Sequence, residues 1–230
     1  MENLFRASKV KLSRALQFID EVEAGLQAYD SSNPISARFS GKGAIEFHFK
    51  EIEPQVLAAL GDAIHNMRTA LDLMASELTR INGESDKKVY FPFADSKDKL
   101  PEQIKNKNFD RAGKDAVALL EKFEPYKGGN KMLRAIHDLD IRDKHTAIIV
   151  TRRVTKDLNF SYRLDEGPNP PISASGSNSH EFLDGPLAGQ PLIETLKELV
   201  QLVDGIIEAF ARMVELREAS NAVTGESPAP

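Results

Sequence analysis

Two short segments contain most of the side chains that could do chemistry. One runs from His65 to Asp72 and the other from His137 to His145, and together they include three of the five histidines. Each segment places histidine, acid and base within a pattern that otherwise indicates an amphipathic helix. Imidazoles and carboxylates can act as general acids and bases and can bind divalent cations. This concentration indicates either a buried polar network or a functional site.

The first segment places three polar side chains on one flank of its predicted helix. His65, Arg68 and Asp72 lie at helical spacing beside the apolar stripe of the same helix. Arg68 and Asp72 are four residues apart and can pair locally. An arginine at the edge of an apolar stripe is partly buried. A buried guanidinium needs acceptors, because leaving it unpaired is costly.

The second segment offers such acceptors. Asp140 and Asp143 fall on the same predicted buried face as Ile136 and Leu139, near the C-terminal end of the helix. Carboxylates there interact unfavourably with the helix dipole, so another group should hold them. We expect Arg68 to do so through a bidentate pair. The hypothesis is therefore a network between two helices, with the two segment histidines at its edge.

Structural and functional interpretations of this cluster both remain open. As a structural feature it is an ion-pair network that fixes the register of two helices, with Lys144 and His145 capping the last carbonyls. As a functional site it offers metal ligands (His65, His137, Asp140 and Asp143, with His145 as a further one). The candidate catalytic residues are the whole set: His65, Arg68, Asp72, His137, Asp140, Asp143, Lys144 and His145.

The composition argues against several classes of protein. The net charge is −5, from 30 basic and 35 acidic residues, which argues against bulk electrostatic binding to nucleic acid or anionic lipid. The chain has no cysteine, so disulfides, thiolate catalysis and cysteine-ligated metal centres are excluded. No signal-peptide core, apolar run of about 20 residues or phosphate-binding loop is present. We expect a cytoplasmic protein without membrane contact and without a cofactor.

Hydrophobic periodicity predicts most of the secondary structure. Apolar residues at helical spacing predict helices over residues 4–29, 54–82, 116–123, 131–144 and 191–218. Alternating or β-branched runs predict strands near residues 35–49 and 146–164. Residues 166–189 are rich in Gly, Pro, Ser and Asn and read as a long loop, and residues 220–230 as a disordered tail.

One predicted strand has a particularly regular alternation. Ile45, Phe47 and Phe49 alternate with Glu46 and His48, which is the period of a half-buried strand. The apolar set should face the core, so His48 should point to solvent.

Together these patterns predict a helix-dominated α+β fold. We expect a bundle of about four long helices with a small antiparallel sheet packed on one side, forming a single domain over residues 1–219. The 191–218 helix is long enough to pair with its copy in a homodimer, although its stripe fits an intramolecular bundle equally well.

Several motifs resemble a family of uncharacterised bacterial proteins. They are the helix His65-Asn-x-Arg-x-Ala-Leu-Asp72, the pair Phe91-Pro92, the turn Glu124-Pro125-Tyr126 and the helix end Asp143-Lys-His145, within roughly residues 55 to 150. The family motif ends in a further basic residue, where this chain has Thr146, and this weakens an anion-binding role for that corner. The resemblance implies the location of a site and no particular activity.

The helical pattern is also loosely similar to the HEPN ribonucleases and nucleotide-binding modules. Their signature, an arginine followed four to six residues later by histidine, is absent from this chain. The sequence therefore favours a helical-bundle protein that binds a protein partner or a small ligand. The alternatives are a metal-dependent hydrolase at the His/Asp cluster, or a HEPN-like nuclease or toxin component of a bacterial defence system.

Overall fold

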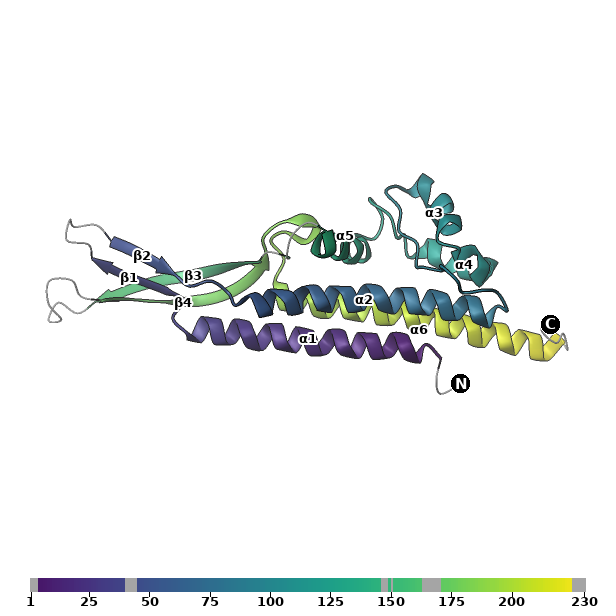
Figure 1. The fold of residues 1–230 in the computed structure, drawn as a ribbon, viewed down its shortest axis with the longest axis horizontal. Helices are drawn as coiled ribbons and strands as arrows, with labels where there is room; N and C mark the ends of the chain where they lie inside the picture. The colour runs from purple at the N-terminus through teal and green to yellow at the C-terminus, as the bar shows by residue number, and fades with distance from the viewer. Residues whose placement is uncertain (1–3, 40–44, 146–148, 150, 163–170, 225–230) are drawn as a thin grey trace.

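Three long helices form an elongated bundle. A computed structural model describes residues 4–39, 45–145, 149, 151–162 and 171–224. The long helices are α1 (Arg6–Ser31), α2 (Pro54–Ile81) and α6 (Leu192–Thr224). In Figure 1, α2 and α6 run in the same direction and α1 runs opposite to both. The start of α1 and the end of α6 lie at one end of the bundle and the sheet lies at the other (Figure 1).

The buried side of α1 explains how it packs. Its buried residues are spaced alternately four and three apart: Ser8, Leu12, Ala15, Ile19, Val22 and Leu26. This spacing produces a narrow seam, as in coiled coils, and α1 lies mainly against α2 and also against α6. Val10 and Leu16 belong to the apolar pattern of the sequence but are exposed.

Three shorter helices lie over α2 and α6, on the side away from α1 (Figure 1). They are α3 (Leu100–Asn106), α4 (Lys114–Lys122) and α5 (Lys131–His145). The aromatic segment before α3 is extended, with Phe91 and Phe93 buried in the core. Most of the helix predictions are confirmed. The described bundle has three long helices where about four were predicted, because α5 is short.

Four antiparallel strands extend beyond the helices at one end of the molecule (Figure 1). They are β1 (Ile35–Phe39), β2 (Ile45–Phe49), β3 (Thr151–Tyr162) and β4 (Pro171–Phe182), in the order β2-β1-β4-β3. The helix-dominated α+β class is confirmed. The sheet continues the long axis of the bundle instead of lying along its side.

The loop predicted at residues 166–189 is wrong over much of its length, because β4 lies there. The Ser-rich sequence of β4 carries little strand signal of its own, but it pairs with β3 from Thr151↔Phe182 to Tyr162↔Ile172. The pattern of residues 146–164 predicts two partner strands, one from 146 through Arg153 and one at 158–164, but residues 151–162 form one strand, β3, with a register shift between Lys156 and Asn159. Residues 146–148 and 150 of the predicted strand lie outside the described residues.

The half-buried position predicted for the 44–49 strand is also wrong. Every residue of β2 is exposed, because β2 is the end strand of the sheet and lies beyond the helices. His48 does point to solvent, as expected, but so do the three apolar residues.

The C-terminal helix is longer than predicted and its stripe is used within the chain. α6 continues to Thr224, past the boundary at 219, and residues 225–230 of the predicted tail lie outside the described residues. Its buried residues pack on α1, α2, α4 and α5. The stripe that could have served a homodimer is therefore covered within the bundle.

Candidate functional site

Helices α2 and α5 bring the two polar segments together. The Nδ1 atom of His65 lies 2.9 Å from Oδ1 of Asp140, and the Asp140 side chain is 8% exposed while that of His65 is 42% exposed. Nε2 of His65 lies 3.4 Å from the hydroxyl of Thr69. A carboxylate at one ring nitrogen orients the ring and fixes its tautomer.

Arg68 and Asp72 form a closed set of contacts with the chain at Phe91. Arg68 donates to Oδ1 of Asp72 at 2.5 Å and to the carbonyl of Phe91 at 3.1 Å. The Phe91 N–H donates to the same Asp72 oxygen at 2.8 Å. Burial raises the pKa of Asp72, against the lowering effects of Arg68 and the Phe91 N–H. The guanidinium therefore ties α2 to the aromatic segment.

The predicted pair between Arg68 and Asp140 or Asp143 is wrong within the described contacts. Arg68 uses Asp72 of its own helix, and His65 takes the position beside Asp140. His65 and Arg68 are three residues apart, so an axial shift of α5 along α2 by about 4.5 Å would exchange one for the other. The prediction that Asp140 lies on the face of α5 toward α2 is confirmed by its contact with His65.

An aromatic contact links these residues to α5. The Arg68 guanidinium lies 4.8 Å from the centre of the Phe93 ring, and the His137 ring stacks on Phe93 at 4.6 Å with an interplanar angle of 9°. Burial, followed by the charges of Arg68 and Arg134, lowers the pKa of His137 to about 4. His137 is therefore neutral at pH 7 and acts as a flat packing surface.

The low pKa of His137 should make stability depend on pH. Its pKa is about 4 in the folded protein and about 6.5 in an unfolded chain, so the unfolded state binds the proton first as pH falls. We expect a loss of about 1 kcal/mol between pH 7 and pH 4, allowing for its partial exposure. Urea denaturation across this range should show a smaller loss for His137→Gln than for the original chain. Equal pH profiles for the two proteins would contradict the assignment.

Arg134 of α5 is a member of the site that the sequence did not reveal. It is buried and donates to Oδ1 of Asp138 at 2.9 Å, to the carbonyl of Ala94 at 2.6 Å and to Asp95 at 3.3 Å. The one available signal was the spacing of Arg134 and Asp138, four residues apart on a predicted helix. Together with Arg68, it fastens the aromatic segment to both helices.

The end of α5 lies very close to α2. A Cβ placed on Gly61 would lie 2.4 Å from Oδ2 of Asp143, so the absence of a side chain at Gly61 makes room for that carboxylate. Lys144 and His145 belong to the helical backbone of α5, but their side chains lie outside the described residues. Within the part of the chain that the structure describes, no three His, Asp or Glu residues are grouped closely enough to hold a metal ion.

The chain was compared with protein families, curated proteins and solved structures. No family model, curated protein or solved structure gives a significant match to the chain. Among the described helices, none has both the length and the apolar character needed to cross a membrane.

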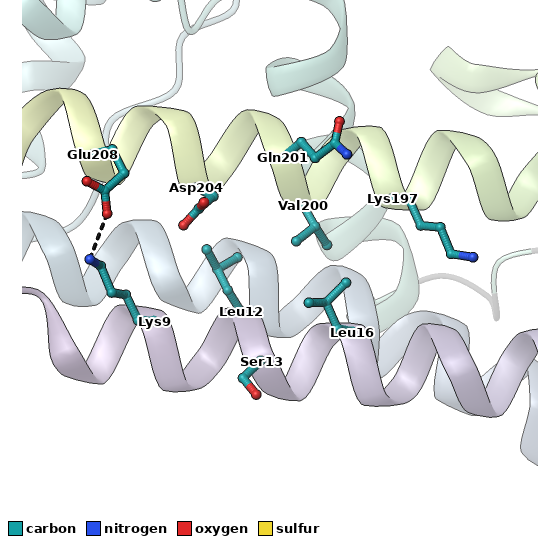
Figure 2. Close-up of a pocket in the computed structure, with 9 residues that line it drawn as sticks. All are labelled: Lys9, Leu12, Ser13, Leu16, Lys197, Val200, Gln201, Asp204 and Glu208. Carbon is teal, nitrogen blue, oxygen red and sulfur yellow. Dashed lines mark ion pairs between the residues drawn. The ribbon is translucent and has the colours of Figure 1, made fainter.

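A groove open to solvent lies between α1 and α6, as Figure 2 shows. Its volume is about 690 Å³. Figure 2 shows Leu12, Leu16 and Val200 between the two helices, with Lys9 bound to Glu208 toward one end. The complete lining is Lys9, Leu12, Ser13, Leu16, Lys197, Val200, Gln201, Asp204 and Glu208. This groove was not predictable from the sequence, because its lining residues come from opposite ends of the chain.

Proposed function

We propose that the protein is a cytoplasmic helical-bundle binding protein without catalytic activity, whose α1–α6 groove receives an amphipathic helix from a partner protein. One observation carries this proposal: the groove between α1 and α6 is open to solvent beside an exposed leucine, Leu16, with Leu12 and Val200 buried beneath it. Leu16 is 42% exposed. The likeness to a bacterial protein family supports a bacterial setting.

The dimensions of the groove favour a short helical segment. The lining residues on α6 run from Lys197 to Glu208, which is about 16 Å at a rise of about 1.5 Å per residue. Two ion pairs connect α1 to α6: Lys9 to Glu208 at 2.6 Å and Lys197 to Glu23 at 2.8 Å. About three turns of a partner helix therefore fit along the groove, in the helix-in-groove mode of recognition.

The charges on the rim favour a basic partner. Both lysines of the lining are engaged by glutamates across the groove. Asp204 is exposed, and its charge acts on Lys9 nearby. A lysine or arginine on a partner helix would complement Asp204, while an adjacent leucine would cover Leu16.

The polar cluster on α2 and α5 has a structural role in this proposal. Arg68 and Arg134 satisfy their donors within the chain, and His137 is neutral and stacked. These contacts hold α5 and the aromatic segment on α2, and α2 in turn packs against α1 and α6, the two helices that line the groove.

A labelled amphipathic peptide of leucine and lysine tests the groove. Fluorescence anisotropy should show saturable binding to the original chain, and about tenfold weaker binding to Leu16→Asp, because a carboxylate would then be buried under the partner's leucines. Asp204→Lys should weaken binding of this peptide and strengthen binding of its leucine–glutamate counterpart.

Val10→Asp is the matched control. Val10 is exposed on the same helix but does not line the groove, so its substitution should leave the affinity unchanged. Equal affinity for Leu16→Asp and the original chain, or an equal loss in both variants, would overturn the proposal.

A further inference from the structure

The exposed strand β2 has an unusual surface for the end of a sheet. Ile45, Phe47 and Phe49 are 47%, 45% and 70% exposed, and alternate residues of a strand lie on one face. The rings of Phe47 and Phe49 stack at 6.4 Å. Exposed apolar end strands invite pairing with another strand, so proteins usually protect them.

The opposite end of the sheet has such protection. β3 carries exposed charges at Arg152, Lys156 and Asp157, and its register shifts between Lys156 and Asn159. Charges and irregular register both discourage a further strand from adding there. β2 has a regular five-residue register with β1 and three apolar residues. A further strand can therefore add at β2 more readily than at β3.

The hydrogen bonding of β2 shows which of its backbone groups face outward. The Lys50 N–H donates to the carbonyl of Pro34 at 2.9 Å. In an antiparallel pair the residues that bond to the neighbour alternate, and the register pairs Ile35 with Phe49. Residues 46 and 48 therefore direct their backbone groups toward β1, and residues 45, 47 and 49 direct theirs away from it.

We propose that β2 pairs with β2 of a second copy of this chain, antiparallel and with a two-fold axis at Phe47. This register places Phe47 opposite the partner's Phe47, and Ile45 opposite the partner's Phe49. The outward-facing backbone groups of residues 45, 47 and 49 then meet one another as hydrogen-bonded pairs. A single register thus satisfies the backbone and brings the apolar side chains of the two copies together.

The polar face of β2 is self-complementary in the same register. Glu46 lies opposite the partner's His48, and His48 opposite the partner's Glu46. These are the positions between the hydrogen-bonded pairs, where facing side chains approach most closely. A carboxylate thus faces an imidazole that can donate to it. A shift of the register by two residues would remove both the axis at Phe47 and this match.

The interface is small, so the dimer should dissociate on dilution. Five residues from each copy bury less surface than a standard stable interface. The two sheets join into one sheet of eight strands, with the helical bundles at its two ends. The groove between α1 and α6 takes no part in this contact, so the dimer and the proposed partner binding can be tested separately.

Analytical ultracentrifugation over a concentration series tests this dimer directly. The original chain should associate reversibly, and Phe47→Lys should weaken association by about tenfold or more, because two like charges would face each other at the axis. Leu216→Lys is the control, because Leu216 is 69% exposed on α6, away from the sheet. A monomer at every concentration, or an equally strong dimer in Phe47→Lys, would overturn the proposal.

A cross-link gives a second test that does not depend on the stability of that variant. The chain has no cysteine, so Phe47→Cys introduces a single thiol. Facing residues of a hydrogen-bonded pair have Cα atoms about 5.5 Å apart, which suits a disulfide. Mild oxidation should give a covalent dimer of Phe47→Cys much faster than of Leu216→Cys. Equal rates for the two variants would count against the pairing.

Discussion

Replacing Arg68 with alanine should destabilise the protein by about 3 to 5 kcal/mol, the range found when one partner of a buried ion pair is removed. Arg68 is buried, pairs with Asp72, donates to the Phe91 carbonyl and lies over Phe93. Without it, the half-buried carboxylate of Asp72 and a buried carbonyl lose their partner. Urea denaturation, with the m-value checked, measures this loss.

Arg80→Ala on the same helix is the matched control. Arg80 forms an exposed pair with Asp86 at 3.2 Å, and exposed pairs contribute less than about 1 kcal/mol. The double variant Arg68→Met/Asp72→Asn should recover part of the loss, because neither residue then leaves a buried charge unpaired. A loss below 1 kcal/mol for Arg68→Ala would show that the pair is not structural, and would return the cluster to consideration as a working site.

Gly61→Ala should destabilise the protein by about 2 kcal/mol, although alanine normally favours a helix over glycine. The new Cβ would lie 2.4 Å from Oδ2 and 2.6 Å from Cγ of Asp143. The carboxylate must then move from its position between α5 and α2. Thermal or chemical denaturation should show a lower midpoint for the variant.

The same change in α6 should have the opposite sign. Gly205 lies within α6, and a Cβ there would meet nothing within 4 Å. Gly205→Ala should therefore stabilise the protein by about 0.5 to 1 kcal/mol. If both alanine variants were stabilising, α2 and α5 could not approach each other as closely as described.

All the described α-helices except α3 were predictable, because each has an apolar stripe at helical spacing; α3 lies in a polar segment for which no helix was predicted. The limits of α2 also follow from the residues at its ends, Pro54 at the start and Asn82-Gly83 after the last turn. β4 could not be recognised, because its Ser-rich sequence becomes a strand through pairing with β3 and not through its own propensity. The exposure of β2 depends on where the sheet ends, and an alternating pattern does not contain that information.

The two predicted polar segments do come together, but the pairing within the cluster differs from the prediction. Helical spacing determines which flank of α2 carries His65, Arg68 and Asp72, and all three make polar contacts. It does not determine the axial position of α5, and that position decides whether His65 or Arg68 meets Asp140. Arg68 also donates to the backbone carbonyl of Phe91. Every residue has such a carbonyl, so side-chain patterns in the sequence do not indicate this partner.

The parallel arrangement of α2 and α6 has a consequence for how the chain folds. α1 and α2 are close in sequence and can associate early. The third long helix, α6, is separated from α2 by the whole stretch from Asn82 to Pro191. Contacts between α6 and the first two helices are therefore non-local, and such contacts slow folding. During synthesis, α1 and α2 leave the ribosome well before α6. The apolar side of the α1–α2 pair therefore stays exposed until α6 is made, and we expect it to be a site of chaperone binding on the nascent chain.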